Sequence, residues 1–539
     1  MKIIALSSLE KVFHDEAPSA PEYKSFSMLK NERSSFQAAF CPEGGGKVTV
    51  TLGGDLAAAT KAYIVREVPV GLPCFENADD LYLRKTPGDY PDVLESADGG
   101  FKAEGGNWYS VWVEVSPNGG YIGSSELTVE VECGEESGEA RVTVEVIDAE
   151  LPEQSIICTE WYHSDCICNY YGIEPFSDEY WRINENYMRT ASTHGMNCIL
   201  TPLFTPPLDT KVGGERRTVQ LVKVRRAGGK YYFDFTNLKK WIDLAQRCGI
   251  RYFEMSHFFT QWGAKHAPKI VAIDRKGREK KIFGWSTRTS SKAYDDFLRQ
   301  FGSALVRFID DNGIRERCFF HISDEPSLAH LKIYKQRAKL ISEIFPGFTV
   351  IDALSNLEFY ETGAVKQPIP CENEADKFFG KVPELWTYYC CGQGSEYMPN
   401  RFMSMPSLRN RVLGIIMYKY DVKGFLQWGY NFYNTQYSIK NIDPYKVTDA
   451  GGAFPSGDSF VVYPGKGGEA VPSLRLKVFY DAFQDVAALR LLESKLGREK
   501  VLEFIDKDLF KPLTFREYPH ENDWLLETRE KINQMIKEN

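Results

Sequence analysis

The sequence predicts an all-β sandwich domain followed by an α/β barrel of the (β/α)₈ TIM type, with a C-terminal helical extension. Three observations point to this fold class: alternating β runs up to about residue 150, apolar runs separated by helical segments after it, and a purely helical end. A chain of 539 residues also exceeds the size at which one hydrophobic core stops growing. We assign residues 1–150 to an N-terminal β-sandwich domain, 151–490 to the barrel, and 491–539 to a helical extension packed on the barrel.

The N-terminal region reads as antiparallel strands because apolar and polar residues alternate with a period of two, and Gly or Pro separates the runs. The runs are SSFQAAF (34–40), GGKVTVTLGG (45–54), NWYSVWVEV (107–115), SSELTVEVEC (124–133) and EARVTVEVIDAEL (139–151). Together they favour one sandwich.

After LPEQS (151–155) the pattern changes to apolar runs typical of buried parallel strands. Eight such runs occur: IICTEWYH (156–163), NCILTPLF (197–204), RYFEMSHF (251–258), CFFHISDE (318–325), FTVIDALS (348–355), ELWTYYCC (384–391), GFLQWGYN (424–431) and SFVVYPG (459–465). Eight strands with helices between them predict a closed barrel, although the last connection looks more like a loop than a helix.

Helical segments separate several of these runs. In residues 177–195, Ser177 and Asp178 are capping candidates, Ile183, Tyr187 and Ala191 share one face, and a Gly ends the segment. Residues 236–249 and 290–313 repeat this pattern, and residues 473–497 begin the helical C-terminal part.

Composition indicates a globular protein with 43% hydrophobic and 26% charged residues, and no segment is long and apolar enough for a membrane span. The net charge of −9, without an evident basic stripe interleaved with aromatics, disfavours nucleic acid as a partner. Aromatic residues make up 14% of the chain, which suits a large core or stacking surfaces for sugar rings. The oligomeric state stays open.

The N-terminus has a single Lys and a short apolar stretch, too short for a secretory signal, so we expect a cytoplasmic protein. The twelve Cys fit reduced, buried thiols better than a disulfide framework. Cys166 with Cys168 and Cys390 with Cys391 lack the paired spacing of a zinc site. We therefore expect no metal and no cofactor.

Asp324 and Glu325 end the fourth apolar run and precede Pro326. The carboxyl ends of barrel strands form the active-site face, and a bend at Pro326 can bring both side chains into one cleft. The alternative is that Ser323 and Asp324 cap a helix beginning near Ser327 while Glu325 is solvated.

Two carboxylates this close raise one pKa, which suits a general acid. The usual retaining glycosidase places its carboxyls about 5 to 5.5 Å apart on opposite sides of the scissile bond, which sequence neighbours do poorly. Adjacent residues suit the substrate-assisted variant, in which the sugar's own 2-acetamido oxygen is the nucleophile.

The chain resembles glycoside hydrolase family 123, β-N-acetylgalactosaminidases with a β-sandwich before a (β/α)₈ barrel. HISDEP (321–326) matches the family's Asp-Glu pair. KNERSSFQAAF (30–40), PGDYPDVL (87–94), ELWTYYCC (384–391), GFLQWGYNFYN (424–434) and GDSFVVYPG (457–465) agree in order over almost the full length. The resemblance implies that Asp324 orients the acetamido group of a terminal β-linked N-acetylgalactosamine and that Glu325 is the general acid/base.

The resemblance also implies substrate-binding residues. The family's Tyr that bonds the acetamide oxygen is Tyr388 by its position, with Tyr389 as the alternative, and Trp428 and Trp386 are candidate hydrophobic walls, or core residues. The remaining candidates for sugar contacts are Asn431, Asp458, Tyr463 and His257. A turn role for Asp458 and core or loop-anchoring roles for His163, Asp165 and His257 are the competing interpretations.

One segment departs from the family pattern, because Tyr480, Asp481 and Ala482 stand where the family usually has Arg-Asp-Gly. The preferred sugar therefore stays open between N-acetylgalactosamine and N-acetylglucosamine, which differ only at C4. An enzyme resembling family 20 and a non-catalytic carbohydrate-binding barrel are the competing functions.

Overall fold

The computed structural model describes residues 1–539, and its N-terminal part is a sandwich of two five-stranded sheets. One sheet has the order β1-β3-β8-β5-β6 and the other β2-β10-β9-β4-β7. The strands are β1 (Lys2–Ser7), β2 (Ser25–Leu29), β3 (Ser34–Cys41), β4 (Gly46–Gly53), β5 (Thr60–Val70), β6 (Gly88–Ser96), β7 (Phe101–Ala103), β8 (Tyr109–Val115), β9 (Gly123–Cys133) and β10 (Glu136–Ile147).

Alternation along the strands explains the sandwich. In β9, Leu127, Val129 and Val131 are buried while the residues between them are more exposed, and Val142 and Val144 of β10 do the same. The strands pair antiparallel as predicted, except that β10 and β2 run parallel.

The barrel that follows is one eight-stranded parallel sheet, as the sequence predicts. In chain order its strands are β11 (Ile157–Glu160), β12 (Cys198–Thr201), β15 (Tyr252–Met255), β18 (Cys318–Phe320), β19 (Thr349–Ala353), β20 (Gln367–Ile369), β21 (Leu385–Tyr388) and β22 (Val422–Gln427). The sheet closes between β20 and β21, where Cys371 and Tyr388 form an isolated parallel bridge.

The predicted eighth strand was wrong. Residues 462–464 form β23 (Val462–Pro464), which pairs antiparallel with β24 (Ala470–Pro472) outside the barrel. The strand that completes the barrel is β20, only three residues long and containing Pro368, so it lacks the apolar run of a typical strand. Tyr388 therefore ends the seventh barrel strand and Trp428 follows the eighth.

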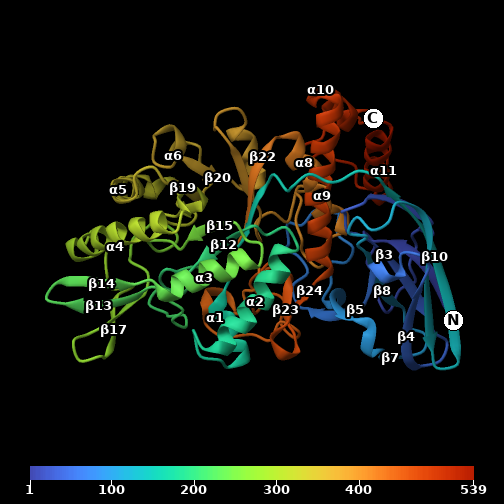
Figure 1. The fold of residues 1–539 in the computed structure, drawn as a ribbon, viewed down its shortest axis with the longest axis horizontal. Coiled ribbons are helices and arrows are strands. Elements are labelled where there is room, and N and C mark those ends of the chain that lie inside the picture. The colour runs from blue at the N-terminus through green and yellow to red at the C-terminus, as the bar shows by residue number, and fades with distance from the viewer.

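Helices cover the outside of the barrel (Figure 1). The three predicted between the strands are present as α2 (Asp178–Ser192), α3 (Thr236–Arg247) and α4 (Lys292–Asp311), and the Ser177 hydroxyl accepts the Tyr180 N–H as an N-cap. The others are α1 (Ser164–Tyr171), α5 (Leu331–Ile344), α6 (Glu358–Glu361), α7 (Ser407–Arg411), α8 (Leu413–Lys419), α9 (Leu474–Leu496), α10 (Arg498–Asp506) and α11 (Asn522–Glu538). The predicted boundary at residue 490 falls inside α9.

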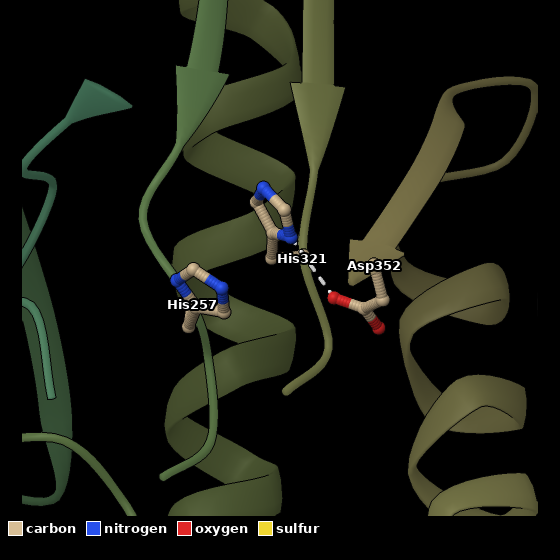
Figure 2. Close-up of side chains that lie close together, drawn as sticks. All are labelled: His257, His321 and Asp352. Atoms are coloured by element: carbon tan, nitrogen blue, oxygen red, sulfur yellow. Dashed lines mark hydrogen bonds and ion pairs between the residues drawn. The ribbon is translucent and has the colours of Figure 1, made fainter. Parts of the chain in front are cut away.

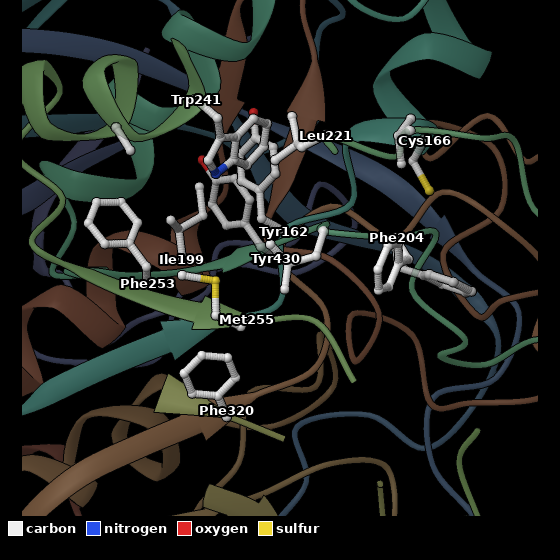
Figure 3. Packing of buried hydrophobic residues seen from close by; sticks show 14 of the residues in the cluster. Tyr162, Cys166, Ile199, Phe204, Leu221, Trp241, Phe253, Met255, Phe320 and Tyr430 are labelled. Atoms are coloured by element: carbon white, nitrogen blue, oxygen red, sulfur yellow. The ribbon is translucent and has the colours of Figure 1, made fainter. Parts of the chain in front are cut away.

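Side chains of the barrel strands alternate between the interior and the helical shell. Leu200 and Phe319 belong to the interior cluster, whereas Ile199 and Phe320 pack outward with the helices. Figure 3 shows part of the outer layer around Phe253 and Phe320. Side chains therefore fill the interior of the barrel.

A shared core joins the sandwich to the barrel through α9, which stands between them in Figure 1. The cluster of 39 buried residues includes Leu94 and Trp112 of the sandwich together with Leu413 of α8 and Phe479 of α9. A further sheet projects from the loops after β12 and β15: β13 (Lys223–Ala227), β14 (Lys230–Asp234), β16 (Ile270–Ile273) and β17 (Glu279–Phe283). None of the helices combines the length and the hydropathy needed to cross a membrane.

Candidate active site

A pocket of about 200 Å³ opens at the carboxyl ends of the barrel strands. Four of the residues predicted from the sequence line it: Asp324, Glu325, Tyr388 and Trp428. The rest of the lining comes from Trp161, His163, Leu208, Asp209, Gln261, Trp262, Ala353, Cys390, Cys391, Leu426, Gln436 and Phe454. This face is where catalytic groups of such barrels gather.

The two adjacent carboxyl groups reach one pocket because the chain turns at Glu325, whose φ is +42°. On a regular strand neighbours point in opposite directions, and this left-handed conformation removes that alternation. Hydrogen bonds fix the turn, since the Glu325 N–H donates to the Ala353 carbonyl at 3.0 Å. The alternative interpretation, a helix cap by Ser323 and Asp324, is not what the structure shows, because Ser327 is the N-cap of the short helix Leu328–His330.

The environments of the two carboxyls differ. Asp324 is 8% exposed, whereas Glu325 is exposed at the pocket mouth. Burial raises the pKa of Asp324 well above its usual range, the neighbouring Glu325 adds to the rise, and His321 opposes it. The free pocket therefore holds a proton on this pair more tightly than ordinary carboxylates would.

Beneath Asp324 lies a buried network centred on His321. Its Nδ1 is 2.9 Å from Asp352 Oδ1 and its Nε2 is 2.5 Å from Glu254 Oε1, and both side-chain pairs are fully buried. Burial alone would lower the pKa of His321, but Glu254 and Asp352 raise it to about 9. His321 is therefore an imidazolium at neutral pH, and it places a positive charge under Asp324.

This network includes a group that could be mistaken for a metal site. His257, His321 and Asp352 offer ligand atoms within 4.8 Å of one another, and Figure 2 shows His321 between the other two. Both nitrogens of His321 already bond to carboxylates, so this ring has no free lone pair for an ion. The residues present fit a hydrogen-bonded network better than a metal centre.

Tyr388, the last residue of β21, and Tyr389, which follows it, have different surroundings. The Tyr388 hydroxyl donates to Glu325 Oε1 at 2.6 Å within the pocket. Tyr389 faces the core shared with the sandwich, where its ring packs at 5.0 Å from Phe425. Of the two alternatives, only Tyr388 lines the pocket.

Trp428 is positioned by Asp458. The indole Nε1–H donates to Asp458 Oδ2 at 2.9 Å, and Asp458 itself is fully buried and does not line the pocket. Burial raises the pKa of Asp458 to about 7, although the Trp428 hydrogen bond and Arg401 favour its charged form. Asp458 thus acts on the pocket through Trp428.

Four other predicted residues lie outside the pocket lining. Trp386 is in the barrel interior, and Asn431 Oδ1 accepts the His163 N–H at 2.8 Å. The Tyr463 hydroxyl donates to Asp92 of the sandwich at 2.5 Å. His257 stacks on His321 with ring centroids 4.1 Å apart, and both of its nitrogens lack a partner.

Several lining residues were not predicted. His163, for which the sequence favoured a core or loop-anchoring role, lies in the pocket wall. Arg216 lies 3.0 Å from His163 Nδ1 and forms a buried ion pair of 2.6 Å with Asp165. Burial and Arg216 lower the pKa of His163 to about 3. Trp262 and Asp209 were also missed, although both follow barrel strands, which is the position that identified Asp324.

Comparisons with known proteins agree with this architecture. The family model described as the glycoside hydrolase 123 catalytic domain matches residues 161–492. A family 123 glycoside hydrolase from Clostridium perfringens, studied for glycolipid glycan hydrolysis, superposes with a TM-score of 0.75 at 14% identity, covering 100% of this chain and 97% of its own.

A β-glucuronidase 3 from Bacteroides uniformis aligns over 85% of this chain and 51% of its own at 9% identity, with a TM-score of 0.32, too low to indicate a common overall fold. No curated protein matches the chain significantly.

Proposed function

The chain belongs to glycoside hydrolase family 123, and on this basis we propose that it is a retaining exo-β-N-acetylgalactosaminidase that acts by substrate-assisted catalysis. The observation that carries the proposal is the pair of adjacent carboxyls in one pocket, one buried and one at the mouth. The aglycone would be a further sugar chain, such as that of a glycolipid, on which the Clostridium perfringens relative was studied.

In the proposed reaction, Asp324 accepts the acetamido N–H and stabilises positive charge as the acetamide oxygen attacks the anomeric carbon. Glu325 donates a proton to the glycosidic oxygen, the C–O bond breaks, and a bicyclic oxazolinium ion forms. Glu325 then takes a proton from a water that attacks the anomeric carbon from the face that the leaving group occupied. The anomeric configuration is therefore retained.

The electrostatics support this division of roles. In the empty pocket burial favours a neutral Asp324, and the acetamido group brings the N–H and the developing charge that favour its ionised form. Glu325 is the exposed member and faces the mouth, where a leaving group departs.

Tyr388 and Trp428 support the binding of an N-acetylated sugar. The Tyr388 hydroxyl, bonded to Glu325 in the free enzyme, can turn to the acetamide oxygen when the sugar is bound. Trp428 offers an indole face fixed by Asp458, and sugar C–H faces pack well on such surfaces.

The test is hydrolysis of nitrophenyl β-glycosides of N-acetylgalactosamine, N-acetylglucosamine and galactose, with the product anomer followed by NMR. We expect the first to be cleaved fastest, with retention, and the plain galactoside to be inert because it lacks the nucleophile. A thiazoline analogue of N-acetylgalactosamine should bind far more tightly than substrate. Faster hydrolysis of the N-acetylglucosamine glycoside would change the proposed sugar. Inversion of the anomeric configuration would refute the substrate-assisted mechanism.

A further inference from the structure

Two exposed aromatic side chains meet at the mouth of the pocket. Trp262, in the loop after β15, lines the pocket and is 41% exposed, while Tyr437, in the loop after β22, is 37% exposed. Their ring centroids are 5.8 Å apart at an interplanar angle of 89°. Most aromatic residues of this chain are buried, so an exposed pair in contact beside a pocket is a distinctive feature.

Both loops hold these residues in unfavourable backbone conformations. Trp262 has a φ of +55° and Ala264 of +53°, and Tyr437 and Ser438 have +61° and +52°. The left-handed region is unfavourable for a bulky residue, and such strain is often found at functional sites.

Asp209 joins the two loops. Its carboxylate accepts the Tyr437 N–H at 3.0 Å, its carbonyl accepts the Ser438 hydroxyl at 2.7 Å, and its own N–H donates to Gln261 Oε1 at 2.6 Å. The backbone N–H of Trp262 donates to the Asp324 carbonyl at 2.9 Å, which ties this loop to the backbone at the carboxyl pair. The aromatic pair is therefore pre-organised rather than free to collapse.

We propose that Trp262 and Tyr437 form the binding site for the sugar on the leaving-group side of the scissile bond. The inference rests on the proposed function: if the terminal sugar fills the pocket, the next residue of the chain crosses the mouth beside Glu325. The ligand class is a neutral pyranose whose C–H face packs on the indole. The enzyme then selects substrates that carry at least one further sugar beyond the hexosaminyl group.

Kinetics with two substrates test the proposal. The first is a β-N-acetylgalactosaminyl-galactose disaccharide, and the second is the methyl β-glycoside, which has no second ring. Trp262→Ala should lower the ratio of kcat/KM for the disaccharide to that for the methyl glycoside by at least about fivefold, and Tyr437→Ala should lower it less. Trp262→Phe, which keeps an aromatic face, should restore most of the ratio.

Tyr232→Ala is the matched control, because Tyr232 is a 56% exposed aromatic on β14, outside the pocket lining. It should leave the ratio unchanged. An unchanged ratio in Trp262→Ala, or equal losses on both substrates, would refute the proposal and assign the indole a structural role.

Calorimetric binding to the Glu325→Gln enzyme separates this inference from the proposed function. The disaccharide should bind several-fold more tightly than the methyl glycoside, and Trp262→Ala should remove that difference. If the wild type hydrolyses no hexosaminide but the disaccharide still binds more tightly than the methyl glycoside, the proposed function is wrong and the aromatic binding site stands. Equal binding of the two ligands refutes the aromatic site whatever the activity.

Discussion

Glu325 and Asp324 are neighbours in sequence with unequal surroundings, and the proposed chemistry depends on this inequality. The left-handed turn at Glu325 exposes its carboxyl while Asp324 stays buried above the His321 imidazolium. Glu254 and Asp352 hold that charge in place through both ring nitrogens. Because these groups are in one hydrogen-bonded and electrostatic network, the effects of substituting them should not be additive.

Glu325→Gln should lower kcat on natural glycosides by about 10² to 10⁴, the usual loss for a general acid. The loss should be much smaller on aryl glycosides whose leaving groups depart without protonation. Steady-state kinetics on both classes measures this. Equal losses on the two would show that Glu325 is not the acid.

Asp324→Asn should also be severe, because a neutral amide cannot stabilise positive charge on the reacting acetamide. Substrate binding, measured by calorimetry, should suffer less than turnover. A near-normal kcat would mean that the role proposed for Asp324 is wrong.

His321 should make the folded state less stable as the pH rises above neutrality. Its folded pKa of about 9 lies above the unfolded value, so its contribution is complete below about pH 6.5 and is lost as the pH approaches 9. The loss is on the order of 3 kcal/mol. Urea unfolding at several pH values should show this fall in the free energy of unfolding in the wild type and not in His321→Gln. The same downward slope in that variant would assign the effect to other groups.

At the scale of elements, the position of polar residues at strand ends could be predicted from the sequence, whereas the local backbone geometry could not. Asp324 and Glu325 stood out because two carboxyls followed an apolar run. Trp262 follows the previous barrel strand in the same way, but its φ of +55° and its link to Asp324 have no sequence signature for a non-glycine residue.

Short strands and buried aromatics limited the prediction further. β20 has three residues with Pro at its centre, so β23 was mistaken for the eighth strand. Trp386 and Tyr463 were nominated by the family resemblance, and their residue type does not distinguish a pocket wall from core. The structure places one in the barrel interior and the other against the sandwich.

Gly424 of β22 has a steric role that can be tested. A Cβ added there would lie 2.0 Å from the Trp386 ring, which is fully buried in the barrel interior. Gly424→Ala should lower the free energy of unfolding by about 1 to 3 kcal/mol through overpacking. Gly99→Ala is the control, because a Cβ at Gly99 has no neighbour within 4 Å. Equal melting temperatures for Gly424→Ala and Gly99→Ala would contradict the steric role of Gly424.

At the scale of the molecule, buried ion pairs join the sandwich to α9. Arg475 Nε donates to Asp92 Oδ1 at 2.7 Å, and Lys477 is paired with Glu114 at 2.6 Å, with all four side chains at most 7% exposed. We propose that residues 1–150 form a structural domain that depends on these contacts and on the shared core of 39 residues. The two halves should then unfold together.

Asp92→Asn tests this dependence. The substitution keeps the shape but leaves Arg475 buried without its counter-charge, which typically costs 3 to 5 kcal/mol, roughly the loss expected here in the free energy of unfolding. Arg141→Ala breaks an ion pair whose arginine is 59% exposed and should cost at most about 1 kcal/mol. Because the core is continuous, scanning calorimetry should show one transition in all three proteins, shifted to lower temperature in Asp92→Asn. Two separate transitions, with only one moved by Asp92→Asn, would mean that the sandwich and the barrel are independent folding units.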